Sequence, residues 1–244
     1  MKTNARIGCL LVACLSVPLH LSAQSGQARD IVSVHELSVP PKALHAFEQG
    51  VDLLAKKDPA GSLAHFQRAV SEFPGYFEAY YKIGLANLKL WRIPEAEQAY
   101  RKSIELSGGR YAQSFFALGA ILDDREKFAE AESVTRKGLE LDPGAWRGHY
   151  YLGVALLGLN RLQEAEKSVR EAIRSNLNFG QAHLVLADIH RCEKNYGALL
   201  NDLDEYLNLE PDGPASAAAK ALRTSTQRML AESLSATALY QPQP

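Results

Sequence analysis

The chain has 244 residues, of which 46% are apolar and 23% are charged. This apolar content is enough for a buried core and too high for a disordered protein. With 27 basic and 28 acidic side chains the formal charge is −1, which lacks the basic excess that a nucleic-acid-binding protein needs. The three cysteines exclude a disulfide scaffold, because Cys9 and Cys14 lie in the apolar N-terminus and Cys192 is left alone.

The first 23 residues have the three-part layout of a secretory signal. Lys2 and Arg6 form a basic head, residues 7–17 are an uncharged apolar run, and the small residue Ala23 precedes Gln24. The apolar run is shorter than the ~20 residues that a membrane-spanning helix needs. We therefore expect cleavage after Ala23 and a periplasmic or secreted mature protein, with residues 24–40 as a linker.

A second processing site overlaps the first. Residues 11–14 read Leu-Val-Ala-Cys and resemble a bacterial lipobox, in which Cys14 would carry lipid and make the protein a membrane lipoprotein. Residues 15–21 stay apolar, whereas a lipoprotein usually turns polar after its cysteine. Ordinary cleavage is the favoured prediction, lipidation at Cys14 is the alternative, and an uncleaved anchor is the third possibility.

The rest of the chain repeats with a period of 34 residues. Small residues recur at successive separations of 34, 35, 34 and 34, and these anchors are Gly50, Gly84, Gly119, Gly153 and Ala187. Twelve residues after each anchor comes another small or apolar residue, namely Ser62, Ala96, Ala131, Ala165 and Leu199. Helix breakers follow after 24 residues at Pro74, Gly108, Pro143 and Pro211. Repeats of this length indicate stacked supersecondary units.

At these residues the chain resembles the tetratricopeptide repeat (TPR) family, whose unit is a helical hairpin of 34 residues. The matching residues are Ile83-Gly84 with Ala96, Tyr100 and Ser103; Leu118-Gly119 with Ala131, Gly138 and Pro143; and Leu152-Gly153 with Ala165 and Ala172. The resemblance implies an all-α, right-handed α-solenoid with five hairpins over residues 41–212. Their predicted bounds are about 43–76, 77–110, 112–145, 146–179 and 180–212.

Helical periodicity supports the same units. If each anchor is numbered position 8, then positions 4, 7, 8 and 11 lie on one stripe of a helix. In the third unit these are Phe115, Leu118, Gly119 and Leu122. The small residue at position 8 lets the second helix of the hairpin approach closely, with the residue at position 20 as its expected counterpart. Pro214 then starts a capping helix at 213–234, and residues 235–244 are expected to be a disordered tail.

No catalytic constellation occurs in the sequence. It has no phosphate-binding glycine loop, no nucleophile elbow and no paired cysteines of a metal site. His183, His190 and Cys192 are the best metal candidates, yet both histidines occupy packing positions and Cys192 lies about 200° further round the helix than His190. Asp123 and Asp124 are adjacent acids that we expect to be solvated. We therefore predict a protein that is not an enzyme, with no catalytic residue, cofactor, metal or small-molecule substrate.

The remaining functional surface is the face formed by positions 2, 5, 9 and 12 of each first helix. The resemblance implies that this face lines a concave groove that binds a protein or peptide segment. We expect position 5 to present a row of half-exposed rings. The alternative is that these rings only fill gaps between adjacent first helices. The predicted binding residues are Phe47, Tyr81, Leu88, Phe116, Asp123, Arg147, Tyr150, Leu184 and Asp188. Position 5 has no lysine and position 9 no asparagine, so the carboxylate clamp of the chaperone-binding branch is absent.

Two functions fit these features. The favoured one is a non-enzymatic protein-binding scaffold or adaptor outside the cytoplasm, with no nucleic-acid partner and a membrane association only if Cys14 is lipidated. The alternative is an accessory subunit of an envelope enzyme or of a secretion or assembly machine, docked through the capping helix.

Overall fold

The computed structural model describes residues 38–239. The predicted signal at 1–23 lies outside the described residues, as do most of the predicted linker at 24–40 and the end of the predicted tail at 240–244.

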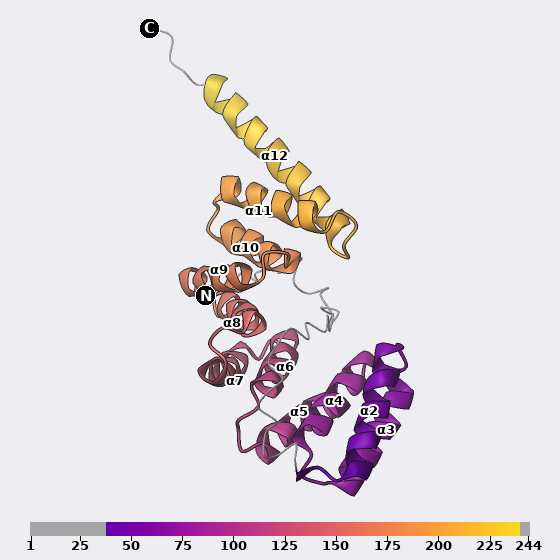
Figure 1. Ribbon diagram of the computed structural model, residues 1–244. Coiled ribbons are helices and arrows are strands. Elements are labelled where there is room, and N and C mark those ends of the chain that lie inside the picture. The colour runs from indigo at the N-terminus through magenta and orange to yellow at the C-terminus, as the bar shows by residue number, and fades with distance from the viewer. Residues whose placement is uncertain (1–37, 240–244) are drawn as a thin grey trace. The chain divides into compact units, whose positions relative to one another are not determined.

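The described chain is entirely helical and contains no strand between residues 38 and 239 (Figure 1). Ten helices of 13 to 15 residues alternate with short turns, and a longer one of 24 residues follows them. They are α2 Pro41–Ala55, α3 Pro59–Glu72, α4 Phe77–Lys89, α5 Ile93–Leu106, α6 Ala112–Asp124, α7 Phe128–Leu141, α8 Trp146–Gly158, α9 Leu162–Ser175, α10 Gly180–Cys192, α11 Tyr196–Leu209 and α12 Ser216–Leu239. The predicted all-α class is confirmed.

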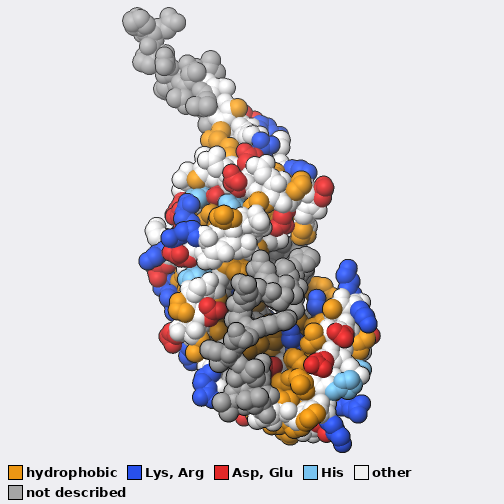
Figure 2. Space-filling model, viewed as in Figure 1, with side chains coloured by type: hydrophobic (Ala, Val, Ile, Leu, Met, Phe, Trp, Pro, Cys, Tyr) orange, Lys and Arg blue, Asp and Glu red, His pale blue; other side chains and the backbone are white. Residues whose placement is uncertain are grey.

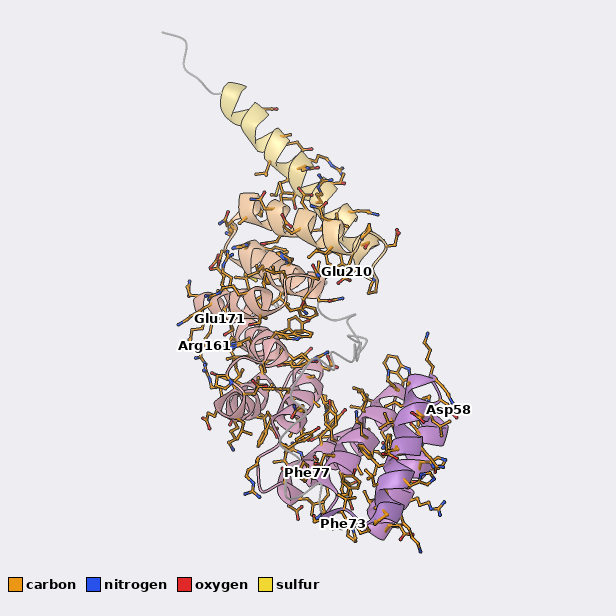
Figure 3. The ribbon with its side chains drawn as sticks, viewed as in Figure 1. Asp58, Phe73, Phe77, Arg161, Glu171 and Glu210 are labelled. Carbon is orange, nitrogen blue, oxygen red and sulfur yellow. The ribbon has the colours of Figure 1, made fainter. Side chains whose placement is uncertain are left out.

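The turn inside each hairpin has one backbone geometry, repeated five times. One residue per turn has a positive φ near 60°, at Lys57, Trp91, Glu126, Asn160 and Lys194. The next residue donates its backbone N–H to a carbonyl five positions back, as Asp58 does to Leu53 and Arg92 does to Asn87. This bonding satisfies the last carbonyls of the first helix. The second helix then begins with its own signal, such as the Asp58 carboxylate that accepts from the Gly61 N–H at 2.8 Å (Figure 3).

The anchor glycines lie where the two helices of a hairpin approach most closely. A Cβ atom added to Gly84 would lie 2.5 Å from the Tyr100 ring, and one added to Gly50 would lie 2.6 Å from Phe66. Gly119 faces Thr135 and Gly153 faces Val169 in the same way. The predicted close approach is present, but the facing side chain is at position 24 and not at position 20. At position 20 of the third and fourth hairpins the backbone carbonyl is the nearby group.

The described helices form two compact units, divided within α8 between Tyr151 and Leu152. In the N-terminal unit (residues 38–151), a core cluster joins α2, α3 and α4 through Ala43, Ala46, Ala69 and Ala79. In the C-terminal unit (residues 152–239), α10, α11 and α12 share a second cluster that includes Leu184, Leu203 and Ala219. Each cluster forms because a single hairpin cannot bury its own apolar stripe.

The last helix is longer than the sequence pattern predicted. It continues to Leu239, past the expected end at residue 234 and into the segment expected to be disordered. Residues 235–239 read Ser-Ala-Thr-Ala-Leu, which contain no glycine or proline to stop a helix. In Figure 1 the second half of α12 stands clear of α11. No helix within residues 38–239 is long and apolar enough to cross a membrane.

Candidate functional site

The histidines that could have held a metal serve as packing and pairing residues in the C-terminal unit. The His190 Nδ1 atom lies 2.6 Å from a carboxylate oxygen of Asp202, and its Nε2 atom lies 3.6 Å from Glu166. Both His190 and Asp202 are buried. No set of three His, Cys, Asp or Glu side chains in the described chain is placed to hold a metal ion. Burial raises the pKa of the Cys192 thiol, which disfavours a reactive thiolate there.

The position-5 rings are not the half-exposed row that the sequence predicted. Phe47 is half-buried, but Tyr81, Phe116 and Tyr150 are buried, with exposed fractions of 8%, 6% and 3%. The prediction is wrong in this respect because these rings fill the spaces between neighbouring helices.

Ring contacts give the physical reason for that burial. The Phe47 ring centre lies 4.9 Å from that of Tyr76, which directly precedes α4. Tyr81 lies 5.5 Å from Tyr111, which directly precedes α6. Phe116 lies against the glycine backbone of Gly138 in α7 and of Gly148 in α8. Each ring therefore reaches the next hairpin along the chain and takes part in stacking the repeats.

Two predicted groove residues belong to the interior of the C-terminal unit. Leu184 is fully buried in the core cluster of α10, α11 and α12, so it is not available at the surface. Asp188 is 1% exposed and pairs with Arg191 one turn later at 2.9 Å. Its carboxylate is thereby engaged within its own helix.

Two others remain accessible in the N-terminal unit. Leu88 is half-buried near the end of α4, and Arg147 is half-buried in the first turn of α8. The Arg147 guanidinium lies 4.3 Å from the centre of the Trp146 ring, a distance typical of a cation–π contact.

Asp123 departs most from the sequence-based expectation, because it was expected to be solvated and is 7% exposed. Neither of its carboxylate oxygens has a hydrogen-bond partner among the described residues. Burial, together with the neighbouring charge of Asp124, holds the pKa of Asp123 well above its ordinary range. Desolvation also raises the pKa of Asp124, to about 6.

A group of tyrosines in the N-terminal unit includes Tyr151, which lies near this carboxyl group. Tyr151 lies within electrostatic range of Arg147, Tyr81, Asp124 and Asp123. Tyr100 is fully buried near Tyr81 and Tyr151, and its hydroxyl has no hydrogen-bond partner in the described part of the chain. Burial is the first cause of the raised pKa of each of these tyrosines, and of Tyr111 beside Tyr81. We call this set the tyrosine–aspartate cluster: Tyr81, Tyr100, Tyr111, Asp123 and Tyr151.

Sequence reasoning found Tyr81 and Asp123 but missed the other three members. Tyr111 lies just before a helix, Tyr151 occupies position 6, and Tyr100 occupies position 24, none of which belongs to the expected groove positions. One available signal was that Tyr100 replaces the phenylalanine of the first hairpin, Phe66, and so adds a hydroxyl inside a packed core.

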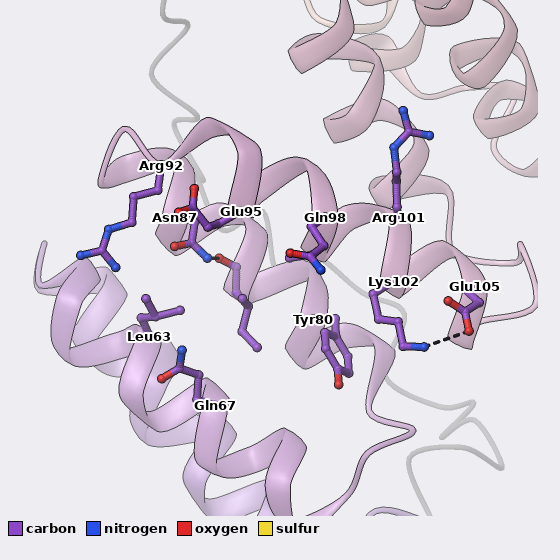
Figure 4. A pocket seen from close by; sticks show the side chains of 12 residues that line it. Leu63, Gln67, Tyr80, Asn87, Arg92, Glu95, Gln98, Arg101, Lys102 and Glu105 are labelled. Atoms are coloured by element: carbon purple, nitrogen blue, oxygen red, sulfur yellow. Dashed lines mark hydrogen bonds and ion pairs between the residues drawn. The ribbon is translucent and has the colours of Figure 1, made fainter.

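A separate hollow of about 610 Å³ lies between α3, α4 and α5. Its floor includes Leu63 and Ile83, and Figure 4 shows Arg92 at one end and the Lys102–Glu105 ion pair at the other. The buried Asn87 side chain at its edge donates to the Ile83 carbonyl at 3.0 Å. That bond supplies the partner that a buried amide at position 11 requires.

Charges on the described surface are mixed. Figure 2 shows acidic and basic side chains interspersed on the face in view, without a broad area of one sign. This distribution agrees with the near-zero formal charge and gives no electrostatic footprint for a nucleic acid on that face.

Comparison with known proteins gives the family and the fold. A family model described as tetratricopeptide repeat matches residues 47–112 and 116–178. Among curated proteins no sequence matches the chain.

Solved structures that resemble the chain include three TPR-fold proteins. MamA from Desulfovibrio magneticus RS-1 (residues 41 to the end) has a TM-score of 0.62 at 18% identity and covers 72% of this chain and 99% of its own. TTC0263 of Thermus thermophilus, a thermophilic TPR protein, scores 0.60 at 19% identity, with 76% and 98% covered. YrrB, described as a TPR protein with an unusual peptide-binding site, scores 0.58 at 20% identity, with 73% and 92% covered. At these identities the likeness concerns the fold.

Proposed function

Since the chain belongs to the tetratricopeptide repeat family, we propose that it is a non-enzymatic scaffold that binds a segment of a partner protein. The binding surface of this proposal is the face of the first helices in the N-terminal unit, formed by α4, α6 and the first turns of α8. YrrB, which has a related fold, is described as having a peptide-binding site. This likeness supports a peptide segment as the class of ligand.

The tyrosine–aspartate cluster is the observation that carries this proposal. Groups with perturbed ionisation gather at functional sites more often than elsewhere. Here a buried carboxyl and four tyrosines with raised pKa values meet within one unit, and Lys82 beside Tyr81 has a pKa lowered by burial. A solenoid needs none of these polar groups for packing, because aliphatic and small side chains suffice.

The described side chains support a binding role better than a catalytic one. Tyr81 and Asp123 are held on neighbouring hairpins without a nucleophile and a base at hydrogen-bond distance beside them in residues 38–239. The His190–Asp202 pair likewise lies buried between α10 and α11 and serves to join these helices.

We place the mature protein outside the cytoplasm on the basis of the N-terminal sequence. The basic Lys2 and Arg6, the apolar run and Ala23 support export. N-terminal sequencing of the mature protein is expected to begin at Gln24. A detergent-soluble species starting at Cys14 that disappears in Cys14→Ser would favour lipidation, and a full-length cytoplasmic protein would contradict both.

Site-specific photo-crosslinking in the native host tests the binding surface. Gln113 is exposed at position 2 of α6 on the proposed face, whereas Lys137 is exposed on α7, the second helix of the same hairpin. A photoreactive residue at 113 should crosslink a discrete protein, and one at 137 should not. Equal crosslinking at both positions, or at 137 alone, would overturn the proposed face.

A second candidate function is docking through α12 as an accessory subunit. It is favoured by the exposed part of that helix, where Met229 is 41% exposed and residues 227–229 and 231–232 lie at the surface. Removing residues 228–244 spares the buried Ala215 and Ala219. Loss of a co-purifying protein from that truncated chain would favour this candidate if the protein crosslinked at position 113 stays the same.

A further inference from the structure

The carboxyl group of Asp123 has an environment that opposes its charge on three counts. Both oxygens are enclosed, and no described residue donates a hydrogen bond to either. Asp124 adds a like charge next to it. Asp123 also lies in the last turn of α6, where the helix dipole places partial negative charge. A buried carboxylate without a partner is among the costlier features that a fold can contain.

The repeats provide an internal comparison, which indicates that packing does not require this residue. Position 12 is leucine in three of the other hairpins, at Leu54, Leu88 and Leu157. In the fifth hairpin it is Arg191, which pairs with Asp188. The third hairpin alone places an acid there, and neither of its carboxylate oxygens has a hydrogen-bond partner among the described residues. Since leucine suits the same position elsewhere, Asp123 points to a role other than folding.

We propose that Asp123 receives the guanidinium of an arginine side chain carried by the bound partner segment. This inference rests on the proposed binding function and names the chemistry recognised at one point of its surface. A guanidinium has five donors in a planar fork, which matches two free oxygens of one carboxylate. Tyrosine rings suit the flat cation, since arginine stacks on aromatic faces. Tyr151 supplies such a ring near Asp123.

The Tyr100 hydroxyl is a second unpartnered polar group of the same cluster. It is buried beside Tyr81 and Tyr151 and has no partner within the described chain. The Tyr100 ring packs against Gly84 in the core of its hairpin, so its hydroxyl is not a ligand contact. The carboxyl group of Asp123 alone carries the recognition proposed here.

The charged groups around Asp123 set how binding depends on pH. The adjacent Asp124 on α6 adds a like charge. Tyr151 on α8 is a neutral hydroxyl near Asp123, and it also has Arg147, Tyr81 and Asp124 within electrostatic range. Arginine stays protonated at all accessible pH values, so only ionised Asp123 pairs with it. Because the pKa of Asp123 is raised, affinity should increase as pH rises through that pKa, and binding below it should release a proton.

The test uses the full chain and two small probes. N-acetyl-arginine N-methylamide carries the guanidinium, and N-acetyl-citrulline N-methylamide is its neutral isostere. Binding is followed by NMR titration at pH 8 for the natural protein, for Asp123→Asn and for Asp123→Leu, which has the residue of the other repeats. Asp52→Asn, an exposed acid on α2, is the matched control.

We expect the arginine probe to bind the natural protein and Asp52→Asn about tenfold more tightly than the citrulline probe. Both Asp123 variants should abolish this preference, and calorimetry in two buffers should detect proton release with the natural protein and Asp52→Asn only. Equal binding of the two probes, binding of neither, or a preference that survives in Asp123→Asn would overturn the inference. The photo-crosslink at 113 reports independently on the scaffold function, so a discrete crosslink without arginine preference would reject this inference alone.

Discussion

At the scale of single residues, two kinds of locally unfavourable side chain are visible. Four of the five hairpin turns place a residue other than glycine or asparagine at positive φ, namely Lys57, Trp91, Glu126 and Lys194. Asp123 is buried without a partner in the described chain. The first kind arises from the geometry of the repeat, whereas the second is independent of that geometry.

Replacing Lys57 with glycine should stabilise the protein. The left-handed conformation costs a side-chain-bearing residue about 1 kcal/mol, which glycine does not lose. Part of that gain is offset by the greater freedom of glycine in the unfolded chain, so we expect a rise of about 0.5 kcal/mol in the free energy of unfolding. Urea denaturation provides the measurement. Lys56→Gly, one residue earlier at φ −77°, should destabilise; a gain from both variants would contradict the turn geometry.

The pH dependence of stability tests the burial of Asp123. Its folded-state pKa is raised, so between its ordinary value near 4 and the raised value the native protein binds a proton that the unfolded chain does not. The free energy of unfolding therefore falls as pH rises through that window. Asp123→Asn removes this loss and should gain about 1–3 kcal/mol at pH 8 but little below pH 4. Thermal melts at a series of pH values measure the difference, and an equal gain at every pH would contradict it.

At the scale of helices, close approach and ring insertion hold each unit together. Each anchor glycine faces a position-24 side chain of the same hairpin, as Gly84 faces Tyr100. Rings at position 5 then reach the next hairpin, as Tyr81 reaches Tyr111. Across the surface, Arg101 bonds Glu97 of its own helix and Glu130 of α7, and Arg125 also bonds Glu97. Exposed ion pairs of this kind add little stability beside the buried contacts.

Gly119→Leu should be among the most damaging single substitutions. Its side chain would enter the space held by Thr135, where even a Cβ atom is too close. Overpacking of a helix contact costs about 1–3 kcal/mol, and a larger loss is expected where backbone blocks relaxation. Chemical denaturation of Gly119→Leu and of Gly75→Ala compares the two positions. Gly75 has ordinary contacts at 3.5 Å and a normal φ, so an equal loss there would argue against the hairpin register.

Phe116→Ala should destabilise the N-terminal unit rather than weaken binding alone. The ring is buried against Gly138 and Gly148, which lack side chains that could fill the space it leaves. Removal of a buried phenylalanine typically costs about 3–5 kcal/mol. Circular dichroism melts of the variant check this loss, with Leu88→Ala, a half-buried neighbour, as the milder comparison. An unchanged melting midpoint of the Phe116→Ala variant would contradict the burial of this ring and indicate a surface position.

At the scale of the whole molecule, periodicity predicted the architecture because every repeat is subject to the same packing constraint. Gly50 to Ala187 mark five hairpins, and glycine, proline and aspartate mark the turns. Local periodicity assigned a face to each residue but could not tell which faces the next hairpin covers. For this reason Phe116 and Leu184 were predicted at a surface and lie in the interior. Asp123 was expected in solvent because the pattern carries no information on the helix beside it.

The C-terminal helix closes the last hairpin, and its two halves should differ in their contribution. Ala215 and Ala219 are buried in the core cluster with Leu184, Leu203 and Tyr206. The Tyr206 hydroxyl accepts from the Ala215 N–H at 3.1 Å and so fixes the start of α12. Residues 227–232 lie mostly at the surface.

Truncation should separate these halves. Deleting 228–244 spares the buried Ala215 and Ala219, and residues 228–232 lie mostly at the surface. The melting midpoint should therefore change by no more than about 2 °C, because surface changes contribute little. Deleting 215–244 uncovers the apolar face of α10 and α11, so we expect a lower midpoint and aggregation, since solenoids need a polar end. Calorimetry with light scattering compares the two chains. If the chain with the longer deletion remains monomeric and equally stable, α12 does not cap the solenoid. The surface of α11 that α12 covers would then be a candidate docking site for a partner.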